Sequence, residues 1–348
     1  MKVLITGAPG WLGTRFLMAL CGKIPELRDI FSINEIEEVR CLVQDGLLQN
    51  ILEEIHPKVK VYPGNLLDIS SLEDFFSGTN DALLFHMAGI VHPHKRVKEF
   101  FNVNVKGSKN ILELAVKNKV KKIVAISSNS PAGTNQNGGL FTEEMPYNPY
   151  MGYGLSKMQM EVIFKDAYKR GDIETVILRP CWFYGPNQPP RQTLFFTMIK
   201  KGSVPIVGNG ENKRSMSYID NTCQGMLLAG KSIKANGQTY WIADKKPYSM
   251  NEIVDTIEKL LEEEFKIKVS HKRMRLPDFA SELAYGIDWT LQSLNIYHQK
   301  IHVLSEMNKN IACSVAKAQK ELGYEPVVEL AEGMRRSIKW CLEKGYKV

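Results

Sequence analysis

A tyrosine and a lysine four residues apart are the side chains of this sequence best suited to acid–base chemistry. Tyr153 and Lys157 stand in the segment Tyr-Gly-Leu-Ser-Lys, which has the pattern of a helix start. Positions i and i+4 share one helix face, so the ammonium can lie near the phenol. A nearby positive charge favours the phenolate and predicts a lowered pKa for Tyr153. By itself, such a pair is also typical of an ordinary exposed helix.

Two serines supply a possible third member of the site. Ser127 and Ser128 close an apolar segment, residues 123–127, that predicts a buried strand. A serine hydroxyl opposite the tyrosine can hydrogen-bond the substrate oxygen that gains or loses a proton. Hydride transfer to or from a nicotinamide would complete the chemistry of such a site.

The first thirteen residues predict where that cofactor binds. Residues 3–5 form an apolar run typical of a strand buried on both faces, and a helical pattern covers residues 14–21. Gly7, Gly10 and Gly13 lie between them. Strand, glycine turn and helix place backbone N–H groups and a helix N-terminus against a pyrophosphate. The spacing is G-x-x-G-x-x-G rather than G-x-G-x-x-G, and an ordinary turn with glycines is the alternative.

Further strands are predicted by apolar runs at 39–43, 59–62, 82–86, 123–127, 173–178 and 239–243. Their alternation with helices predicts an α/β fold with a Rossmann-type, doubly wound parallel sheet. The carboxyl ends of such strands line the ligand crevice. We therefore expect cofactor contacts from the residues that follow the third and fourth strands, namely Asn65, Leu66, Met87, Ala88 and Gly89.

The end of the second predicted strand bears on the choice of cofactor. An acidic residue there holds the ribose hydroxyls of NAD, whereas a basic residue accepts the additional phosphate of NADP. Gln44 is neutral, and Asp45 comes one residue later than expected. NAD is the cofactor we predict, with NADP as the alternative.

The pattern loosens after residue 186, where Pro, Gly and short mixed segments run to residue 214. Helices are predicted near 220–230, 249–264, 278–294 and 327–344. We expect a Rossmann domain over 1–185, rejoined by the strand near 239–243, and a smaller C-terminal substrate-binding lobe over 186–348. The stretch 278–305 is amphipathic and rather apolar. A packed lobe helix is the main interpretation, and an apolar substrate site or a membrane contact are the alternatives.

The composition narrows the class of protein. The 348 residues are 44% hydrophobic and 24% charged, typical of a soluble globular protein, and the net charge of +7 is scattered, which disfavours nucleic-acid binding. Six widely spaced cysteines without a C-x-x-C motif predict neither zinc nor a redox pair, and they fit a cytoplasmic location. Without a third ligand in view, His92 and His94 are interpreted as loop residues, so no metal is expected. No apolar run is long enough to span a bilayer, and no signal peptide is expected.

Taken together, the motifs resemble the extended short-chain dehydrogenase/reductase family, which includes nucleotide-sugar epimerases and 3β-hydroxysteroid-type dehydrogenases. The resemblance covers nearly the whole chain through Thr6-Gly7-x-x-Gly10-x-x-Gly13, His86-Met87-Ala88-Gly89, Asn104-Val105-x-Gly107, Ser127-Ser128, Tyr153-x-x-x-Lys157, Leu178-Arg179-Pro180-x-x-x-Tyr184-Gly185-Pro186, Tyr218-Ile219-Asp220-Asn221 and Leu322-Gly323-Tyr324-Glu325-Pro326.

The resemblance implies roles for the site residues. Tyr153 would donate or accept the proton, Lys157 would bind the nicotinamide ribose, and Ser128, five residues before Gly133, would orient the substrate. Further cofactor contacts are implied at Trp11, Leu12, Gln44, Asn104, Ile126, Pro180 and Cys181, in addition to the glycine turn, the strand ends, Tyr153 and Lys157. A homodimer paired through helices near 105–117 and 153–168 is also implied.

Four residues bear on the identity of the substrate. Arg214, four residues before Tyr218, matches the arginine that nucleotide-sugar enzymes place on the substrate diphosphate, and its alternative is a solvated loop residue. Trp182 stands where those enzymes usually carry Asn, so it forms the floor of an apolar pocket or packs in the core. Asn129 and Ser130 replace the Asp-Glu pair of sugar dehydratases, which disfavours dehydration.

The sequence therefore predicts an isomerase acting on a small molecule, most simply a nucleotide-sugar 4-epimerase that works through a transient 4-keto sugar. A 3β-hydroxysteroid-type dehydrogenase or ketoreductase with net hydride transfer is the second hypothesis. A non-catalytic dinucleotide-binding regulator is the third, and the intact Ser128, Tyr153 and Lys157 argue against it.

Overall fold

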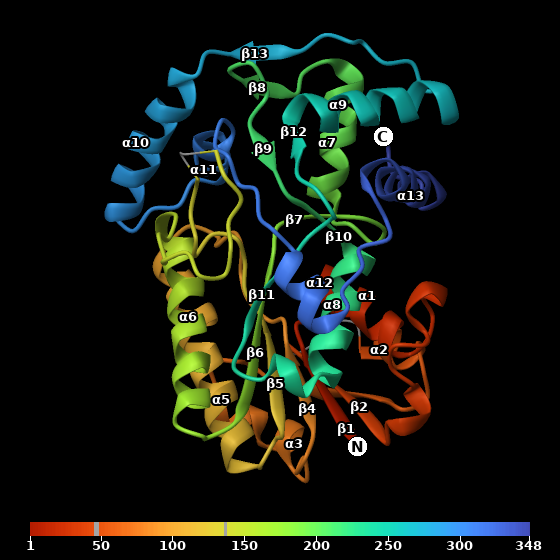
Figure 1. Cartoon of the computed structure of the whole chain (residues 1–348), viewed down its shortest axis with the longest axis vertical. Coiled ribbons are helices and arrows are strands. Elements are labelled where there is room, and N and C mark those ends of the chain that lie inside the picture. Colours follow the sequence, from red (N-terminus) through yellow and green to blue (C-terminus); the bar gives the residue numbers. More distant parts are fainter. Residues whose placement is uncertain (45–48, 136–137) are drawn as a thin grey trace.

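A seven-stranded parallel sheet forms the centre of the computed structural model, which describes residues 1–44, 49–135 and 138–348 (Figure 1). The strands lie in the order β3-β2-β1-β4-β5-β6-β11. Their bounds are β1 Lys2–Thr6, β2 Glu38–Val43, β3 Val59–Pro63, β4 Leu83–His86, β5 Lys122–Ile126, β6 Glu174–Pro180 and β11 Thr239–Ile242. The order reverses between β1 and β4, where sheets of this kind bind ligands at the carboxyl ends of the strands. The predicted Rossmann-type sheet is confirmed.

Helices cover both faces of this sheet (Figure 1). One layer contains α1 (Trp11–Leu20), α8 (Ile219–Lys231) and α12 (Ala316–Leu322), and the other contains α3 (Glu73–Phe76), α5 (Ser108–Lys117) and α6 (Met151–Lys169). Val3 and Ile5 of β1 pack toward the first layer, and Leu4 packs toward the second. All three are fully buried, which explains why the strand is an unbroken apolar run.

A second core lies above the carboxyl edge of the sheet and is formed by α7 (Pro190–Lys201), α9 (Met250–Lys259) and α13 (Leu330–Glu343). Three short strand pairs accompany it: β7 (Trp182–Tyr184) with β10 (Met216–Tyr218), β9 (Lys213–Arg214) with β12 (Tyr248–Ser249), and β8 (Pro205–Val207) with β13 (Met274–Leu276). At one edge, α10 (Phe279–Ser293) and α11 (Gln299–Glu306) form a helical hairpin (Figure 1). The division of the chain at residue 185 stays a prediction.

The remaining elements are short. They are α2 (Gln49–Glu53), α4 (Lys98–Phe100), the π-helical segments Phe101–Gly107 and Leu260–Glu264, and the 3₁₀ turns Pro25–Leu27, Ile33–Glu35, Ile69–Leu72 and Ile233–Ala235. Within the described residues, none of the helices combines the length and the apolar character that a bilayer crossing requires.

One sequence expectation about helices was wrong. The region after residue 186 contains the twelve-residue helix α7 rather than only irregular segments. Pro190 at its first position and Gly202 in a left-handed conformation (φ 69°) after its last residue are helix start and stop signals that would have revealed it. The helix expected near 105–117 is confirmed as α5, and α4 and a π-helical segment precede it in series.

Candidate functional site

Helix α6 carries Tyr153 and Lys157 one turn apart at the carboxyl edge of the sheet. Its first turn is held from two directions, because Gly152 N donates to Gln292 Oε1 of α10 (3.0 Å) and Gly154 N donates to Tyr150 O (3.0 Å). Tyr153 is partly buried, and its ring lies 5.6 Å from that of Phe100. The start of α6 therefore depends on the C-terminal hairpin as well as on its own sequence.

Ser128 is the serine that faces Tyr153. Burial of the phenol raises the pKa of Tyr153 to about 12, and the nearby hydroxyl of Ser128 opposes this shift. The expected lowering by the lysine is therefore wrong for this structure. The side chain of Ser127 points the other way and donates to Glu161 Oε1 at 2.6 Å.

Lys157 is a buried cation with neutral hydrogen-bond partners. Its ammonium donates to the carbonyl of Ile126 at 2.7 Å and to the sulfur of Met160 at 3.2 Å. Burial lowers the pKa of Lys157 to about 8, and the negative charge of Glu161 opposes this shift. The ammonium is thus anchored to the end of β5 rather than paired with a carboxylate, which leaves donor capacity for a ligand.

A buried network beneath the site was not anticipated from the sequence. Glu161, one turn after Lys157, accepts two hydrogen bonds from Arg179 (2.9 and 2.7 Å), one from Ser127 (2.6 Å) and one from Tyr147 (2.7 Å). Glu161 is fully buried, and Arg179 is 2% exposed. These bonds fix α6 to the ends of β5 and β6 and hold the carboxylate charged, since they keep its pKa low against the cost of burial.

The glycine turn is packed too closely to admit side chains. Gly7 has φ +96°, and a Cβ there would lie 2.7 Å from the backbone of Met87 and Ala88. A Cβ on Gly13 would lie 2.5 Å from the carbonyl of Gly7, which shows how closely α1 approaches the turn. Thr6 also joins the carboxyl ends of β1 and β4. Its hydroxyl forms a hydrogen bond with His86 Nδ1 (2.7 Å) and accepts one from Ala88 N (3.2 Å).

The start of α1 also contacts the segment after β7 and the start of α8. Trp11 Nε1 donates to the carbonyl of Pro186 at 2.7 Å, so the indole nitrogen of this expected cofactor residue has a protein partner. Arg15 of α1 makes a bidentate ion pair with Asp220 of α8 at 2.6 and 2.8 Å. These contacts hold the start of α1 beneath the segment that follows β7.

The other expected cofactor residues lie around the same edge. Asn104 is buried, and its amide bonds both backbone groups of Ile90 and the hydroxyl of Ser156, so the geometry gives it a positioning role. Gln44, Asn65 and Gly89 are exposed; Leu12, Leu66, Met87 and Ala88 are partly exposed; Ile126, Pro180 and Cys181 are buried. Asp45 lies outside the described residues.

The side chains of Cys181 and Trp182, which follow β6, lie in different surroundings. The Cys181 sulfur lies 3.6 Å from that of Cys313 within the core. Trp182 is partly buried, and its ring centroid lies 5.4 Å from that of Phe195. The guanidinium of Arg214 lies 5.9 Å from the centroid of the Trp182 ring. The structure thus brings together Trp182 and Arg214, two of the residues that the sequence associated with the substrate.

Arg214 has an unused donor. Its Nη2 donates to the main-chain carbonyl of Glu306, whereas its buried Nε has no hydrogen-bond partner. Burial lowers the pKa of Arg214, and the negative charge of Glu306 opposes that shift. The negative charge of Glu306 also raises the pKa of the Tyr153 phenol. Glu306, on α11, is therefore a residue of the site that the sequence motifs did not reveal.

Comparisons with known proteins show the family to which the chain belongs. The sequence profile of the NAD dependent epimerase/dehydratase family matches residues 3–243. The chain belongs to this family. Membership confirms the prediction that this protein is an enzyme of the extended short-chain dehydrogenase/reductase type. It also confirms NAD as the cofactor.

Three similar proteins can be aligned with most of this chain. The uncharacterized protein y4nL of Sinorhizobium fredii is 47% identical over 345 residues, covering 99% of this chain and 96% of y4nL. The 3beta-hydroxysteroid-dehydrogenase/decarboxylase isoform 1 of Arabidopsis thaliana is 27% identical over 337 residues, 91% of this chain and 72% of that protein. The structure of UDP-glucuronic acid 4-epimerase from Bacillus cereus in complex with NAD has a TM-score of 0.74 at 23% identity, covering 100% of both chains, and shows the shared fold.

The residues of this epimerase/dehydratase family member fit a dinucleotide. The glycine turn leaves no room for side chains between β1 and α1, so backbone can approach a pyrophosphate. The buried ammonium of Lys157 has one carbonyl and one thioether as acceptors, so ribose hydroxyls would suit its remaining N–H. His92 bonds the hydroxyl of Tyr297 (2.6 Å), and no cluster of three or more potential ligands to a metal occurs in 1–44, 49–135 and 138–348.

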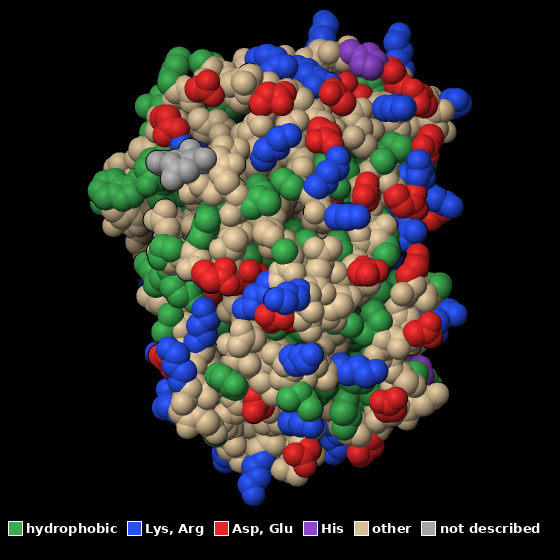
Figure 2. Space-filling model, in the orientation of Figure 1, with side chains coloured by type: hydrophobic (Ala, Val, Ile, Leu, Met, Phe, Trp, Pro, Cys, Tyr) green, Lys and Arg blue, Asp and Glu red, His purple; other side chains and the backbone are tan. Residues whose placement is uncertain are grey.

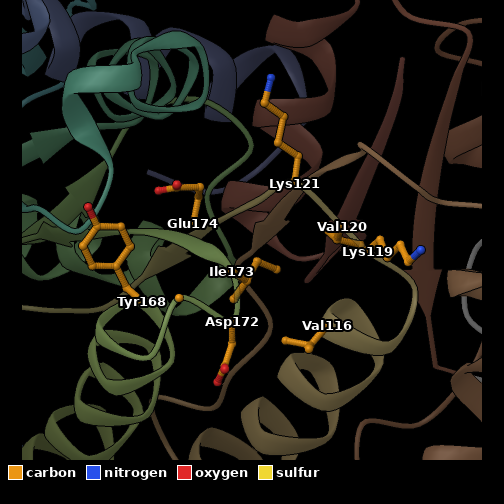
Figure 3. A pocket seen from close by; sticks show the side chains of 9 residues that line it. Val116, Lys119, Val120, Lys121, Tyr168, Asp172, Ile173 and Glu174 are labelled. Carbon is orange, nitrogen blue, oxygen red and sulfur yellow. The ribbon is translucent and has the colours of Figure 1, made fainter.

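An open pocket of about 540 Å³ lies elsewhere, at the amino ends of β5 and β6 (Figure 3). Its lining includes Lys121, Tyr168, Asp172 and Glu174, with opposite charges on facing segments. Ligands of parallel α/β sheets bind at the carboxyl ends of the strands. This pocket is at the opposite edge and is not part of the candidate site.

Proposed function

We propose that this protein is an NAD-dependent 4-epimerase of nucleotide sugars that works through a transient 4-keto sugar. The observation that carries the proposal is the facing pair of Ser128 and Tyr153 beside the buried ammonium of Lys157, at the carboxyl edge of the sheet and near the glycine turn. Such a pair can hold one substrate oxygen between two hydroxyls while a proton leaves it.

Each residue has a distinct task in this proposal. Tyr153 removes the proton from the C4 hydroxyl and later returns it, and Ser128 hydrogen-bonds the same oxygen as it becomes a carbonyl. Lys157 places its positive charge beside the reacting group and offers its free N–H to the ribose. The chemistry that a bound NAD supplies is reversible hydride transfer at C4. Turning the keto sugar between the two transfers inverts C4 with no net consumption of NAD.

Arg214 supports a diphosphate-bearing substrate. Its buried Nε lacks a partner, and a guanidinium suits bidentate recognition of phosphate oxygens. The absence of an acidic pair at Asn129 and Ser130 leaves no carboxylates there to expel a hydroxyl, which favours epimerisation over dehydration.

Trp182 favours a second candidate function. Its ring packs with Phe195 and presents apolar surface beside Arg214, and one relative is named a 3beta-hydroxysteroid-dehydrogenase/decarboxylase. In this alternative, the same Ser128 and Tyr153 would serve a dehydrogenase or ketoreductase with net hydride transfer to a hydroxy or keto substrate.

Turnover by Tyr153→Phe tests the shared mechanism. This variant keeps the ring and removes the hydroxyl, so we expect loss of turnover with NAD binding largely intact, measured by C4 inversion of UDP-sugars and by nucleotide binding. Full activity would contradict the assignment of Tyr153. Accumulation of NADH with hydroxysteroids, without sugar inversion, would favour the second candidate.

We also propose a homodimer formed through α5 and α6. Val116 of α5 and Val162 and Tyr168 of α6 are exposed apolar side chains on these helices. Light scattering should give twice the 39.5 kDa chain mass, and a monomer at micromolar concentration would contradict this interface. The cytoplasmic location stays a prediction.

A further inference from the structure

Helix α10 is inverted relative to an ordinary amphipathic helix. Its three buried positions are small or polar, namely Ser281, Ala284 and Asp288. The large apolar side chains on and beside it are exposed instead: Met274, Phe279, Leu283, Tyr285, Ile287, Trp289, Leu294 and Ile296. Phe279 is 68% exposed, and Trp289 is 60% exposed. Globular proteins bury such side chains, so this face is suited to a contact outside the chain.

These side chains form a continuous surface. Figure 2 shows hydrophobic side chains gathered along the edge of the molecule where α10 lies. A shallow hollow of about 350 Å³ runs along the helix between Leu283 and Leu291 and has mostly apolar walls. We call this surface the α10 face, comprising Phe279, Leu283, Ile287, Trp289 and Leu294.

The polar side of α10 prevents the helix from rotating to bury this face. Asp288 Oδ2 is 2.7 Å from His302 Nδ1, and Ser281 Oγ donates to Leu304 O at 2.7 Å. Gln292 bonds both Asp288 (2.9 Å) and the start of α6 (3.0 Å). Rotation would break all these bonds, so the exposed face is built into the fold.

Basic side chains flank the α10 face at both ends. Six exposed Lys or Arg residues lie on segments 94–98 and 272–300: Lys95, Arg96, Lys98, Lys272, Arg275 and Lys300. The first segment is attached to the carboxyl end of α10, since Lys98 N donates to Asn295 Oδ1 (2.8 Å) and Tyr297 N to Lys95 O (2.9 Å). The exposed carboxylates of these segments are Asp278 and Glu282, and Glu282 pairs with Lys309.

We propose that the α10 face is a docking surface for an anionic lipid bilayer, with α10 lying in the plane of the interface. Apolar side chains, including Phe and Trp, on one face of a helix with basic residues at its borders are what such binding requires. A second copy of this chain would meet the same positive charge on both sides, which opposes self-association through this face.

Docking would bring the reacting groups close to the lipid surface. Tyr285 of α10 lies 5.8 Å from the ring of Tyr150, the residue that precedes α6, and Gln292 bonds the first turn of α6 itself. The proposal concerns where the enzyme works and does not depend on which reaction it catalyses.

Vesicle co-sedimentation of the full chain tests the proposal. We expect binding to mixed phosphatidylcholine and phosphatidylglycerol vesicles and weaker binding to phosphatidylcholine alone. Binding to the mixed, anionic vesicles should decline as the salt concentration rises. The double variant Leu283→Glu with Ile287→Glu should bind at least about tenfold more weakly, because charges would enter the interface. Ile233→Glu is the matched control, since Ile233 is 80% exposed outside the α10 face.

The basic residues give an independent readout. Replacing Lys95, Arg96 and Lys98 by Ala should weaken binding to anionic vesicles about fivefold for each residue, because each contributes about 1 kcal/mol near such a surface. Binding to phosphatidylcholine should change little.

Equal vesicle binding by the double glutamate variant and by the control would overturn the proposal. The absence of vesicle binding would also overturn it. Light scattering in which the double glutamate variant alone loses an association beyond the α5–α6 dimer would then show that a second copy occupies the face. Neither measurement uses turnover, so failure here is distinct from failure of the proposed function.

Discussion

Replacing Glu161 by leucine removes the carboxylate on which four buried hydrogen bonds converge. Arg179, Ser127 and Tyr147 donate to it at 2.6–2.9 Å, and neither Glu161 nor Arg179 has appreciable contact with water. Glu161→Leu leaves the guanidinium buried without its counter-ion. Loss of one partner of a buried pair costs about 3–5 kcal/mol.

The melting temperature converts this cost into an observable. Unfolding entropy of about 2.1 cal/mol/K per residue gives about 0.7 kcal/mol/K for 348 residues, so Tm should fall by about 4–7 °C. Thermal unfolding followed by circular dichroism measures this shift, and urea unfolding provides a second measure.

The double variant Glu161→Leu with Arg179→Met separates the charge from the packing. It removes both charges at similar volume, so the cost should fall to about 1–3 kcal/mol, which is the penalty for the unpaired hydroxyls of Ser127 and Tyr147. A single variant that melts within about 1 °C of the natural protein, or a double variant less stable than the single one, would refute the reasoning.

Further predictions concern the turn, the lysine and the substrate arginine. Gly13→Ala should abolish or weaken NAD binding at least about tenfold, because its Cβ would lie 2.5 Å from the Gly7 carbonyl; Gly286→Ala, with open space around it, should leave titrations of NAD unchanged. The folded-state pKa of Lys157, about 8, lies below its ordinary 10.5, so the unfolded chain binds more protons between these values. The free energy of unfolding from urea titrations should therefore gain on the order of 3 kcal/mol from this group as pH rises from 8 to 10.5, and Lys157→Met should lack that gain. Arg214→Ala should raise KM for UDP-sugars about tenfold or more; an unchanged KM would remove Arg214 from the substrate site.

Sequence pattern predicted the sheet because strands buried on both faces leave unbroken apolar runs, as in residues 3–5. It also predicted that Tyr153 and Lys157 lie on one helix, because they are close in sequence, and their catalytic roles stay predictions. The pKa of Tyr153 was predicted in the wrong direction, because spacing along a helix does not reveal burial.

Features assembled from distant segments could not be predicted. Glu161 is an ordinary helix residue until Arg179 and Ser127, 18 and 34 positions away, are placed around it. Glu306 reaches the site only because α11 folds back toward Arg214. The apolar pattern of α10 was visible, but only the structure shows that its polar side is the buried one.

The nucleotide bound to the freshly purified protein tests the central claim most directly. Denaturing the protein and identifying the released nucleotide by chromatography and mass should yield close to one NAD per chain, because an epimerase regenerates its cofactor in each cycle and has no need to release it. An empty protein, or one that carries NADP, would contradict the epimerase account and favour a dehydrogenase or reductase that exchanges its cofactor at every turnover.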